Sequence, residues 1–276
     1  MSKDTKKVTL SAEQLEELKN ATATQGGGSG VRLPIIDRII FNGNADAVEN
    51  DKGELVRPDI SYFRQIFKGK KQDERPEKVS LGSPLEVIFV KSRRRLVARD
   101  SQGFQVMSTS QHEHPNQTVT LWESGKCIAK GSARALRKKY EDLRTVQETY
   151  VVFKGELILL INKGACLGSE TRDEKYPTFY EYMQSLKDDG IFGHVTILDG
   201  VLEKGVKQFY TPTFEKGRPT TDEEKLEVLN HVRELNSLFI EYDETNKTMD
   251  VGVVEVETED EFETKEEEEN TVADPF

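Results

Sequence analysis

A strand-like run of the chain reads Leu85-Glu86-Val87-Ile88-Phe89-Val90-Lys91-Ser92-Arg93-Arg94-Arg95-Leu96-Val97. Pro84 precedes this run and the turn-forming residues 100–103 follow it, which together with the β-branched side chains is typical of a β-strand. Side chains of a strand alternate between two faces, so we expect Lys91, Arg93 and Arg95 on one face and Arg94 on the other. The run therefore predicts a strand that carries a dense positive charge.

Further strands are predicted on both sides of this run, at residues 33–41, 119–122, 150–153, 156–162, 193–198 and 201–209. Lys154-Gly155 and Asp199-Gly200 are signals for tight hairpin turns. Helices are expected over residues 8–22, over 133–146 after a Ser132 cap, after Pro177, and after Thr221. A few helices among many strands predict an α+β fold, with an OB-like antiparallel β-barrel as its core.

Composition divides the chain into three parts. The glycine-rich residues 26–30 indicate that residues 1–30 form a flexible N-terminal arm and linker. Residues 31–254 form the predicted OB-like core. Residues 255–276 are rich in glutamate and nearly free of aliphatic side chains, so they cannot bury enough apolar surface to fold and are predicted to be a disordered acidic tail.

Charge is distributed unevenly along the chain. The chain of 276 residues has a net charge of −11, and residues 255–276 contain eleven acidic residues against one lysine. The other 254 residues are nearly neutral, and within them residues 57–144 carry a net charge of +9. A basic segment combined with an acidic tail points towards nucleic-acid binding.

The chain ends in Val272-Ala273-Asp274-Pro275-Phe276. An acidic tail that stops on Pro-Phe resembles that of the single-stranded DNA-binding proteins of bacteria and phages, and the chain is closer to the phage type because it lacks a Gly/Gln/Pro-rich linker. The resemblance covers about the last 20 residues. It implies an OB-fold body that coats unpaired DNA in replication, recombination and repair. It also implies a tail that recruits a polymerase, helicase or nuclease through Asp274, Pro275 and Phe276 and that competes with DNA for the basic groove.

Single-strand binding without sequence preference needs cations along the phosphates and flat side chains on which bases stack. The predicted DNA-binding residues are Lys68, Lys70, Lys71, Lys91, Arg93, Arg94, Arg95, Arg99, Phe104, Trp122, Lys126, Arg134, Arg137, Lys138, Lys139 and Tyr140. Lys91–Arg95 is the strongest phosphate candidate, and Phe104 and Trp122 are the best stacking candidates.

Metal, cofactor and catalytic sites are not predicted. His112, His114, Cys127 and Cys166 lack the spacing of a zinc site, and no phosphate-binding loop, nucleophile elbow or zinc-protease motif is found. Asp188-Asp189 and Asp222-Glu223-Glu224 resemble helix-end acids more than Mg²⁺ ligands. We therefore expect a non-enzymatic protein without cofactors. A recombination mediator or annealing protein, and a phage interaction or structural protein that does not bind DNA, stay open as alternatives.

The sequence also bears on location. The longest aliphatic run, Leu157–Ile161, is far shorter than the roughly 20 residues of a spanning helix, and the N-terminus lacks the apolar stretch of a secretory signal. The two cysteines are expected to be reduced. These features predict a protein of the cytoplasm, in a bacterial cell or a phage-infected host, with no membrane contact and with a homo-oligomer left open.

Overall fold

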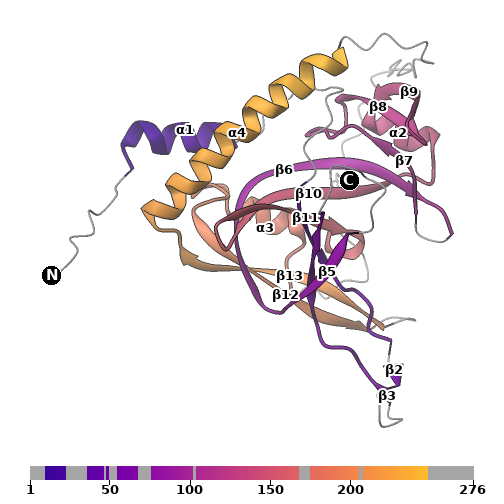
Figure 1. Cartoon of the computed structure of the whole chain (residues 1–276), viewed down its shortest axis with the longest axis horizontal. Coiled ribbons are helices and arrows are strands. Elements are labelled where there is room, and N and C mark those ends of the chain that lie inside the picture. The colour runs from indigo at the N-terminus through magenta and orange to yellow at the C-terminus, as the bar shows by residue number, and fades with distance from the viewer. Residues whose placement is uncertain are drawn as a thin grey trace, which may run out of the picture. The chain divides into compact units, whose positions relative to one another are not determined.

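Strands dominate the computed structural model of the chain, with helices before, between and after them (Figure 1). The structure describes residues 10–22, 36–46, 48–49, 55–67, 76–101, 104–167, 175–204 and 208–247. Its elements are α1 (Ala12–Thr22), β1 (Arg38–Phe41), β2 (Val48–Glu49), β3 (Leu55–Val56), β4 (Tyr62–Ile66), β5 (Glu77–Gly82), β6 (Leu85–Arg99), β7 (Gln105–Thr109), β8 (Thr118–Glu123), β9 (Lys126–Ser132), α2 (Ala133–Lys139), β10 (Arg144–Phe153), β11 (Glu156–Lys163), the 3₁₀ turn η1 (Gly164–Leu167), α3 (Phe179–Ser185), β12 (His194–Lys204), β13 (Gln208–Pro219) and α4 (Asp222–Lys247).

The predicted α+β class is confirmed, but the strands do not form a clear OB-type barrel. Within the described part of the chain, eleven strands join one open sheet in the order β5-β4-β1-β11-β10-β6-β7-β8-β9, and β12 pairs with both β6 and β13. The pairing is also not wholly antiparallel, because β1 runs parallel to β11, with Ile39 opposite Leu160. β2 and β3 form a separate two-stranded sheet.

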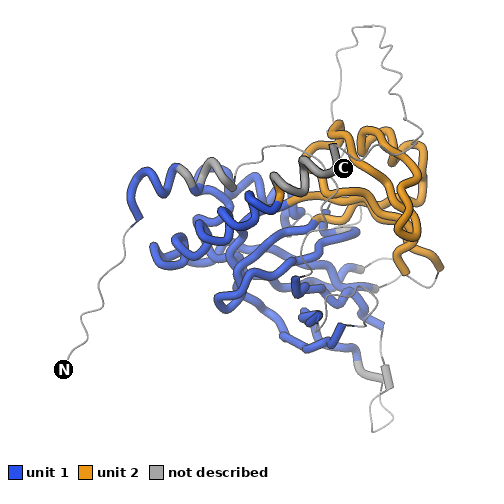
Figure 2. Tube along the Cα trace, turned by 45° about the horizontal axis from the view of Figure 1, so that its top comes forward, with its two compact units in different colours: residues 1–24, 34–92, 148–238 blue, residues 25–33, 93–147, 239–276 orange. Residues whose placement is uncertain are grey.

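The chain divides into two compact units (Figure 2), and each has its own core of buried side chains. One unit comprises residues 1–24, 34–92 and 148–238, and its described core clusters aromatic and aliphatic side chains around Phe89, Tyr182 and Phe214. The other comprises residues 25–33, 93–147 and 239–276, and its described core packs Leu96, Leu121 and Leu136 together. The predicted borders at residues 30/31 and 254/255 lie outside the described residues.

Two kinds of local sequence signal are confirmed. These are the side chains that cap the starts of helices and the residues that form a tight turn. Lys154 and Gly155 have φ values of 52° and 80°, the left-handed conformation of a tight hairpin between β10 and β11. At the start of α4, Thr221 and Glu224 form a capping box, with the Glu224 backbone N–H donating to Thr221 Oγ1 at 3.2 Å. Ser11 caps α1 through the same reciprocal contacts with Gln14.

The predicted turn at Asp199-Gly200 is wrong, because both residues lie inside β12, opposite Thr213 and Pro212 of β13. Tertiary contacts explain why this turn signal does not form a turn. Asp199 Oδ1 accepts hydrogen bonds from Ser83 Oγ at 2.5 Å and from the Gly200 backbone N–H at 2.9 Å. Gly200 is required for close packing, since a Cβ there would lie 2.8 Å from the Phe41 ring.

The predicted helix over residues 133–146 is only half correct. Ser132 caps α2 by accepting a hydrogen bond from the Ala135 backbone N–H at 3.1 Å, as expected. The helix ends at Lys139, however, and the next residue, Tyr140, has φ −113° and ψ 87°. The β-branched residues that follow form β10, where Val146 is buried. The position of Val146 in the sequence fits the pattern of a buried strand as well as the helical spacing on which the helix prediction was based.

No helix in the described ranges is both long enough and apolar enough to cross a membrane.

Phenylalanines of opposite exposure provide a test of where the stability of the fold resides. Phe179 is 1% exposed and its ring lies 5.3 Å from that of Phe214, whereas Phe104 is 61% exposed. We expect Phe179→Ala to lower the free energy of unfolding by about 3–5 kcal/mol and Phe104→Ala to change it by less than about 0.5 kcal/mol. Urea unfolding followed by far-UV circular dichroism measures both, and equal transition midpoints would contradict the assignment of Phe179 to the core.

Candidate functional site

Positive charge is concentrated in residues 93–147, which lie in the second compact unit (Figure 2). This segment contains eleven Lys and Arg against five Asp and Glu, a net charge of +6, although the whole chain carries −11. Twelve of the predicted DNA-binding residues fall in this segment, from Arg93 to Tyr140. The segment is therefore the first place to look for an anion-binding surface.

Lys91 and Arg93, two of the predicted phosphate contacts, instead lie inside the protein. Their exposed fractions are 5% and 1%. Lys91 Nζ donates to Asn236 Oδ1 at 3.1 Å. The Arg93 guanidinium lies 4.3 Å from the centre of the Phe239 ring, and its Nε is 3.7 Å from Glu113 Oε1. Side chains buried in this way cannot reach a DNA phosphate, so these two do not belong to the candidate surface.

The other cations of β6 are more accessible. Arg94 and Arg95 are half-buried, and Arg99 is exposed at the end of the strand. The turn that follows is closed by two hydrogen bonds: the Asp100 backbone N–H donates to the Phe104 carbonyl at 2.9 Å, and the Phe104 N–H donates to Asp100 Oδ1 at 2.8 Å. Phe104, the last residue of this turn, is 61% exposed.

Strand register brings a second aromatic residue to the same end of the sheet. Arg99 pairs with Gln105, and Met107 pairs with Glu123, so the β6–β7 and β8–β9 turns lie at one end of these strands. Trp122 is half-buried there and Lys126 is exposed. We call this group, made of Arg99, Phe104, Trp122 and Lys126, the turn-end cluster.

The remaining cations lie at the other end of β8. Thr118, the first residue of β8, pairs with Ser132, which caps α2. Arg134, Lys138 and Lys139 of α2 are exposed and Arg137 is half-buried. Tyr140, a predicted stacking residue, packs against the core of this unit instead and has Lys139 Nζ 5.8 Å from its ring centre. The six residues of β8 place the two ends about 20 Å apart.

A polar loop over residues 110–117, which joins β7 to β8, positions the arginines at the α2 end. Arg94 of β6 exchanges two backbone hydrogen bonds with His112, at 2.7 and 2.8 Å. The Arg134 N–H donates to the Pro115 carbonyl at 2.8 Å and the Ala133 N–H donates to that of Gln117 at 3.0 Å. The loop thereby bridges β6 and α2. Sequence reasoning considered His112 only as a metal ligand and missed this role.

His112 itself is an uncharged part of this loop at neutral pH. Its side chain is 2% exposed. Burial, reinforced by the nearby charges of Arg94 and Arg93, lowers the pKa of His112 to about 4, although a hydrogen bond to the Ser110 backbone opposes the shift. The positive charges that act on it are those of Arg94 and Arg93.

Several predicted residues cannot be placed. Lys68, Lys70 and Lys71 lie outside the described residues, as do Asp274, Pro275 and Phe276. Their DNA-binding and partner-binding roles stay predictions from the sequence.

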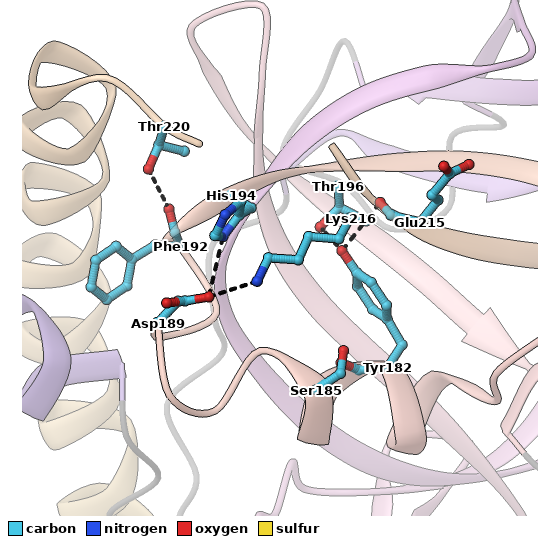
Figure 3. A network of polar contacts seen from close by, with 9 residues as sticks. All are labelled: Tyr182, Ser185, Asp189, Phe192, His194, Thr196, Glu215, Lys216 and Thr220. Atoms are coloured by element: carbon cyan, nitrogen blue, oxygen red, sulfur yellow. Dashed lines mark hydrogen bonds and ion pairs between the residues drawn. The ribbon is translucent and has the colours of Figure 1, made fainter. Parts of the chain in front are cut away.

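A second polar network lies in the other unit and combines serine, histidine and aspartate (Figure 3). Asp189 Oδ2 lies 2.6 Å from Lys216 Nζ and 3.6 Å from His194 Nδ1. The Ser185 hydroxyl donates to the Tyr182 carbonyl at 2.7 Å, which is a local helix contact and not a nucleophile–base pair. Tyr182 Oη shares a hydrogen bond of 2.8 Å with Thr196 Oγ1. Tyr182 thereby attaches α3 to β12, and Asp189, which follows α3, contacts both β12 and β13.

Comparisons with known proteins add no further constraint: no protein-family model, curated protein or solved structure matches the chain.

Buried His112 makes a specific contribution to the pH dependence of stability. Because its pKa is lower in the folded than in the unfolded protein, the unfolded protein binds more protons below pH 6.5. Stability present above that pH is therefore lost as the pH falls towards 4, by about 3 kcal/mol in total. We expect His112→Gln to reduce the loss measured by urea unfolding between about pH 7.5 and pH 5 by about 2 kcal/mol.

His114→Gln is the matched control for this experiment, because His114 is exposed two residues away in the same loop. It should retain the pH dependence of the parent protein. A pH dependence in His112→Gln equal to that of the parent protein would show that His112 is not buried in its neutral form.

Proposed function

We propose that the protein binds single-stranded DNA without sequence preference. The observation that carries the proposal is the net charge of +6 on residues 93–147, combined with an exposed aromatic ring, Phe104, in the same compact unit. Cations that follow the phosphates and aromatic faces that stack on bases are the two requirements of such binding. An OB-like barrel stays a prediction, and the proposal does not need one, because function depends on the site more than on the fold.

The two ends of β8 suit different parts of the DNA. In the turn-end cluster, Arg99 and Lys126 are balanced by Asp100 and Glu123, so this end offers an aromatic surface with little net charge. The α2 end offers Arg94, Arg134, Arg137, Lys138 and Lys139. We infer that bases stack near Phe104 and Trp122 while phosphates contact the α2 end. A strand extended along the roughly 20 Å of β8 would meet both.

The acidic residues 255–276 complete the proposal. They carry eleven acidic side chains, so they compete with DNA phosphates for the cations of residues 93–147 and limit non-specific binding. In this role the protein coats and protects unpaired DNA during replication, recombination and repair. Recruitment of partner proteins by Asp274, Pro275 and Phe276 belongs to the same proposal and rests on the sequence alone.

Removing the ring of Phe104 tests base stacking. Since a stacked base contributes about 1–3 kcal/mol, we expect Phe104→Ala to weaken binding of fluorescein-labelled oligothymidylate about 5- to 100-fold. Fluorescence anisotropy at two salt concentrations measures the affinity and its salt dependence. Phe104→Tyr, which keeps an aromatic face, should bind like the parent protein. An unchanged affinity in the alanine variant would remove Phe104 from the site, and no oligonucleotide binding by the parent protein would contradict the proposed function.

Deleting residues 255–276 tests competition by the acidic segment. A protein that ends at Val254 loses ten negative charges net, so we expect it to bind the same oligonucleotide more tightly at low salt. The gain should shrink at high salt, because the screening length falls from about 10 Å at 0.1 M to about 3 Å at 1 M. Equal affinities of the two proteins at low salt would show that these residues do not compete.

A further inference from the structure

A cavity of about 460 Å³ lies in the compact unit that includes residues 34–92 and 148–238. Its lining comes from the end of β5, the start of β6, the end of β10 with the turn to β11, β12, the end of β13 and the first two turns of α4. Pockets that enclose small molecules have volumes of about 300–1,000 Å³. This cavity is therefore large enough to hold a small organic ligand.

Apolar side chains form more than half of the lining. Ile88 of β6, Val152 of β10 and Val195 of β12 line the cavity and are themselves almost completely buried. Phe153, which is 4% exposed, adds an aromatic side chain. A ligand gains free energy here by removing its own apolar surface from water. The lining therefore suits a molecule with an apolar body better than it suits an inorganic ion.

Five charged side chains complete the lining, and they are Glu86, Lys154, Arg218, Glu224 and Glu227. Three carboxylates against two cations give a net charge of −1. Arg218 is already paired, because its two terminal nitrogens donate to the two carboxylate oxygens of Glu224 at 2.8 and 2.6 Å. Glu224 also accepts a hydrogen bond from the Thr221 backbone N–H at the start of α4. The Arg218–Glu224 pair thus serves the protein itself.

Glu227 and Glu86 have no such role. Within the described ranges, neither carboxylate takes part in a hydrogen bond or an ion pair. A Cβ placed on Gly155 would lie 3.5 Å from Glu227 Oε1, so this carboxylate lies against the β10–β11 turn. Glu227 is the sixth residue of α4, beyond the first turn in which the helix dipole favours acidic side chains. Helix capping therefore does not explain its presence at the cavity.

Lys154 is the lining residue that would attract an anion instead. Its side chain is exposed, and its Nζ lies 5.1 Å from the centre of the Phe153 ring. Once the Arg218–Glu224 pair is set aside, two carboxylates remain against this one ammonium group. The balance of charge at the cavity therefore favours a cationic ligand over an anionic one.

We propose that this cavity binds a small organic cation, which carries an amine or a guanidinium group on an apolar body. The cationic group lies near Glu227, where the carboxylate accepts charge-assisted hydrogen bonds, and the apolar body packs against Ile88, Val152 and Val195. The inference goes beyond the proposed DNA binding and does not rest on it, since no lining residue falls within residues 93–147.

Three ligands of similar shape and different charge test the proposal: phenethylamine, phenethyl alcohol and hydrocinnamate. Isothermal titration calorimetry of the full chain at pH 7 measures their affinities. We expect phenethylamine to bind saturably, and the neutral alcohol and the carboxylate to bind at least about 5-fold more weakly, because a hydrogen bond to a charged group is lost or replaced by repulsion.

Variants of the lining give a test of sign. Glu227→Gln should weaken phenethylamine binding about 5-fold or more, whereas Lys154→Gln should strengthen it, because a like charge is removed. The matched control is Glu234→Gln, since Glu234 is an exposed carboxylate about 10 Å farther along α4 and does not line the cavity. It should bind like the parent protein. Circular dichroism confirms that each variant is folded.

Several results would overturn the organic-cation site and leave the DNA-binding proposal untouched. These are no binding of phenethylamine by the parent protein, equal or tighter binding of the alcohol or of hydrocinnamate, and equal losses in Glu227→Gln and Glu234→Gln. Weaker binding in Lys154→Gln would also contradict it. Acetyl-lysine methylamide, which presents an amine as a protein side chain does, is a further arm. If it bound more tightly than phenethylamine, the assignment to a small-molecule ligand would be wrong.

NMR locates the binding site independently. Phenethylamine should shift the backbone amide signal of Gly155, which lies beside Glu227, and leave that of Gly125 in place. Gly125 is the matched control because it has the same φ of 80° in a turn of the other compact unit. An unchanged Gly155 signal at saturation would overturn the site.

Discussion

The buried contact of Arg93 with Glu113 and with the Phe239 ring is the constraint on which the candidate site depends. Taking a guanidinium and a carboxylate out of water is costly, and the cost is tolerated only when the two groups stay together. Both side chains are 1% exposed. Glu113 lies in the loop that also carries His112 and Pro115, so this ion pair holds the loop against β6. The loop in turn contacts α2 through backbone hydrogen bonds. The positions of Arg94 and Arg134, whose backbones are hydrogen-bonded to this loop, are therefore linked to the buried Arg93.

The faces of β6 show how far the sequence was informative. Residues 85–97 were predicted to be a strand, and β6 covers them. Strand alternation also places Lys91 and Arg93 on the same face as Phe89 and Val97, which are buried. The face is apolar at both ends, and this signal of burial was present in the sequence. The expectation that a run of cations is exposed outweighed this signal. That expectation holds for a cation without a partner, but not for one that has an ion-pair partner elsewhere in the chain.

Interactions that stay within a few residues were predictable, and those between distant residues were not. Thr221 and Glu224 satisfy each other across one helical turn, so their capping box could be recognised from spacing alone. Asp199-Gly200 has an equally clear local signal, but contacts with Ser83 and Phe41 override it. The candidate site belongs to the second kind. Residue types pointed to Arg94, Arg134 and Phe104, whereas strand register decides that the arginines and the aromatic ring lie at opposite ends of β8.

The net charge of the whole chain is a poor guide to what the cationic surface of residues 93–147 binds. At a physiological ionic strength the screening length is about 8 Å, which is less than half of the roughly 20 Å that β8 spans. A DNA phosphate near α2 is therefore affected mainly by the cations next to it and only weakly by acidic residues farther away. The overall charge of −11 governs how the whole molecule repels polyanions at low salt. Under the proposed function, the local arrangement of arginines near α2 would govern binding once a strand has arrived.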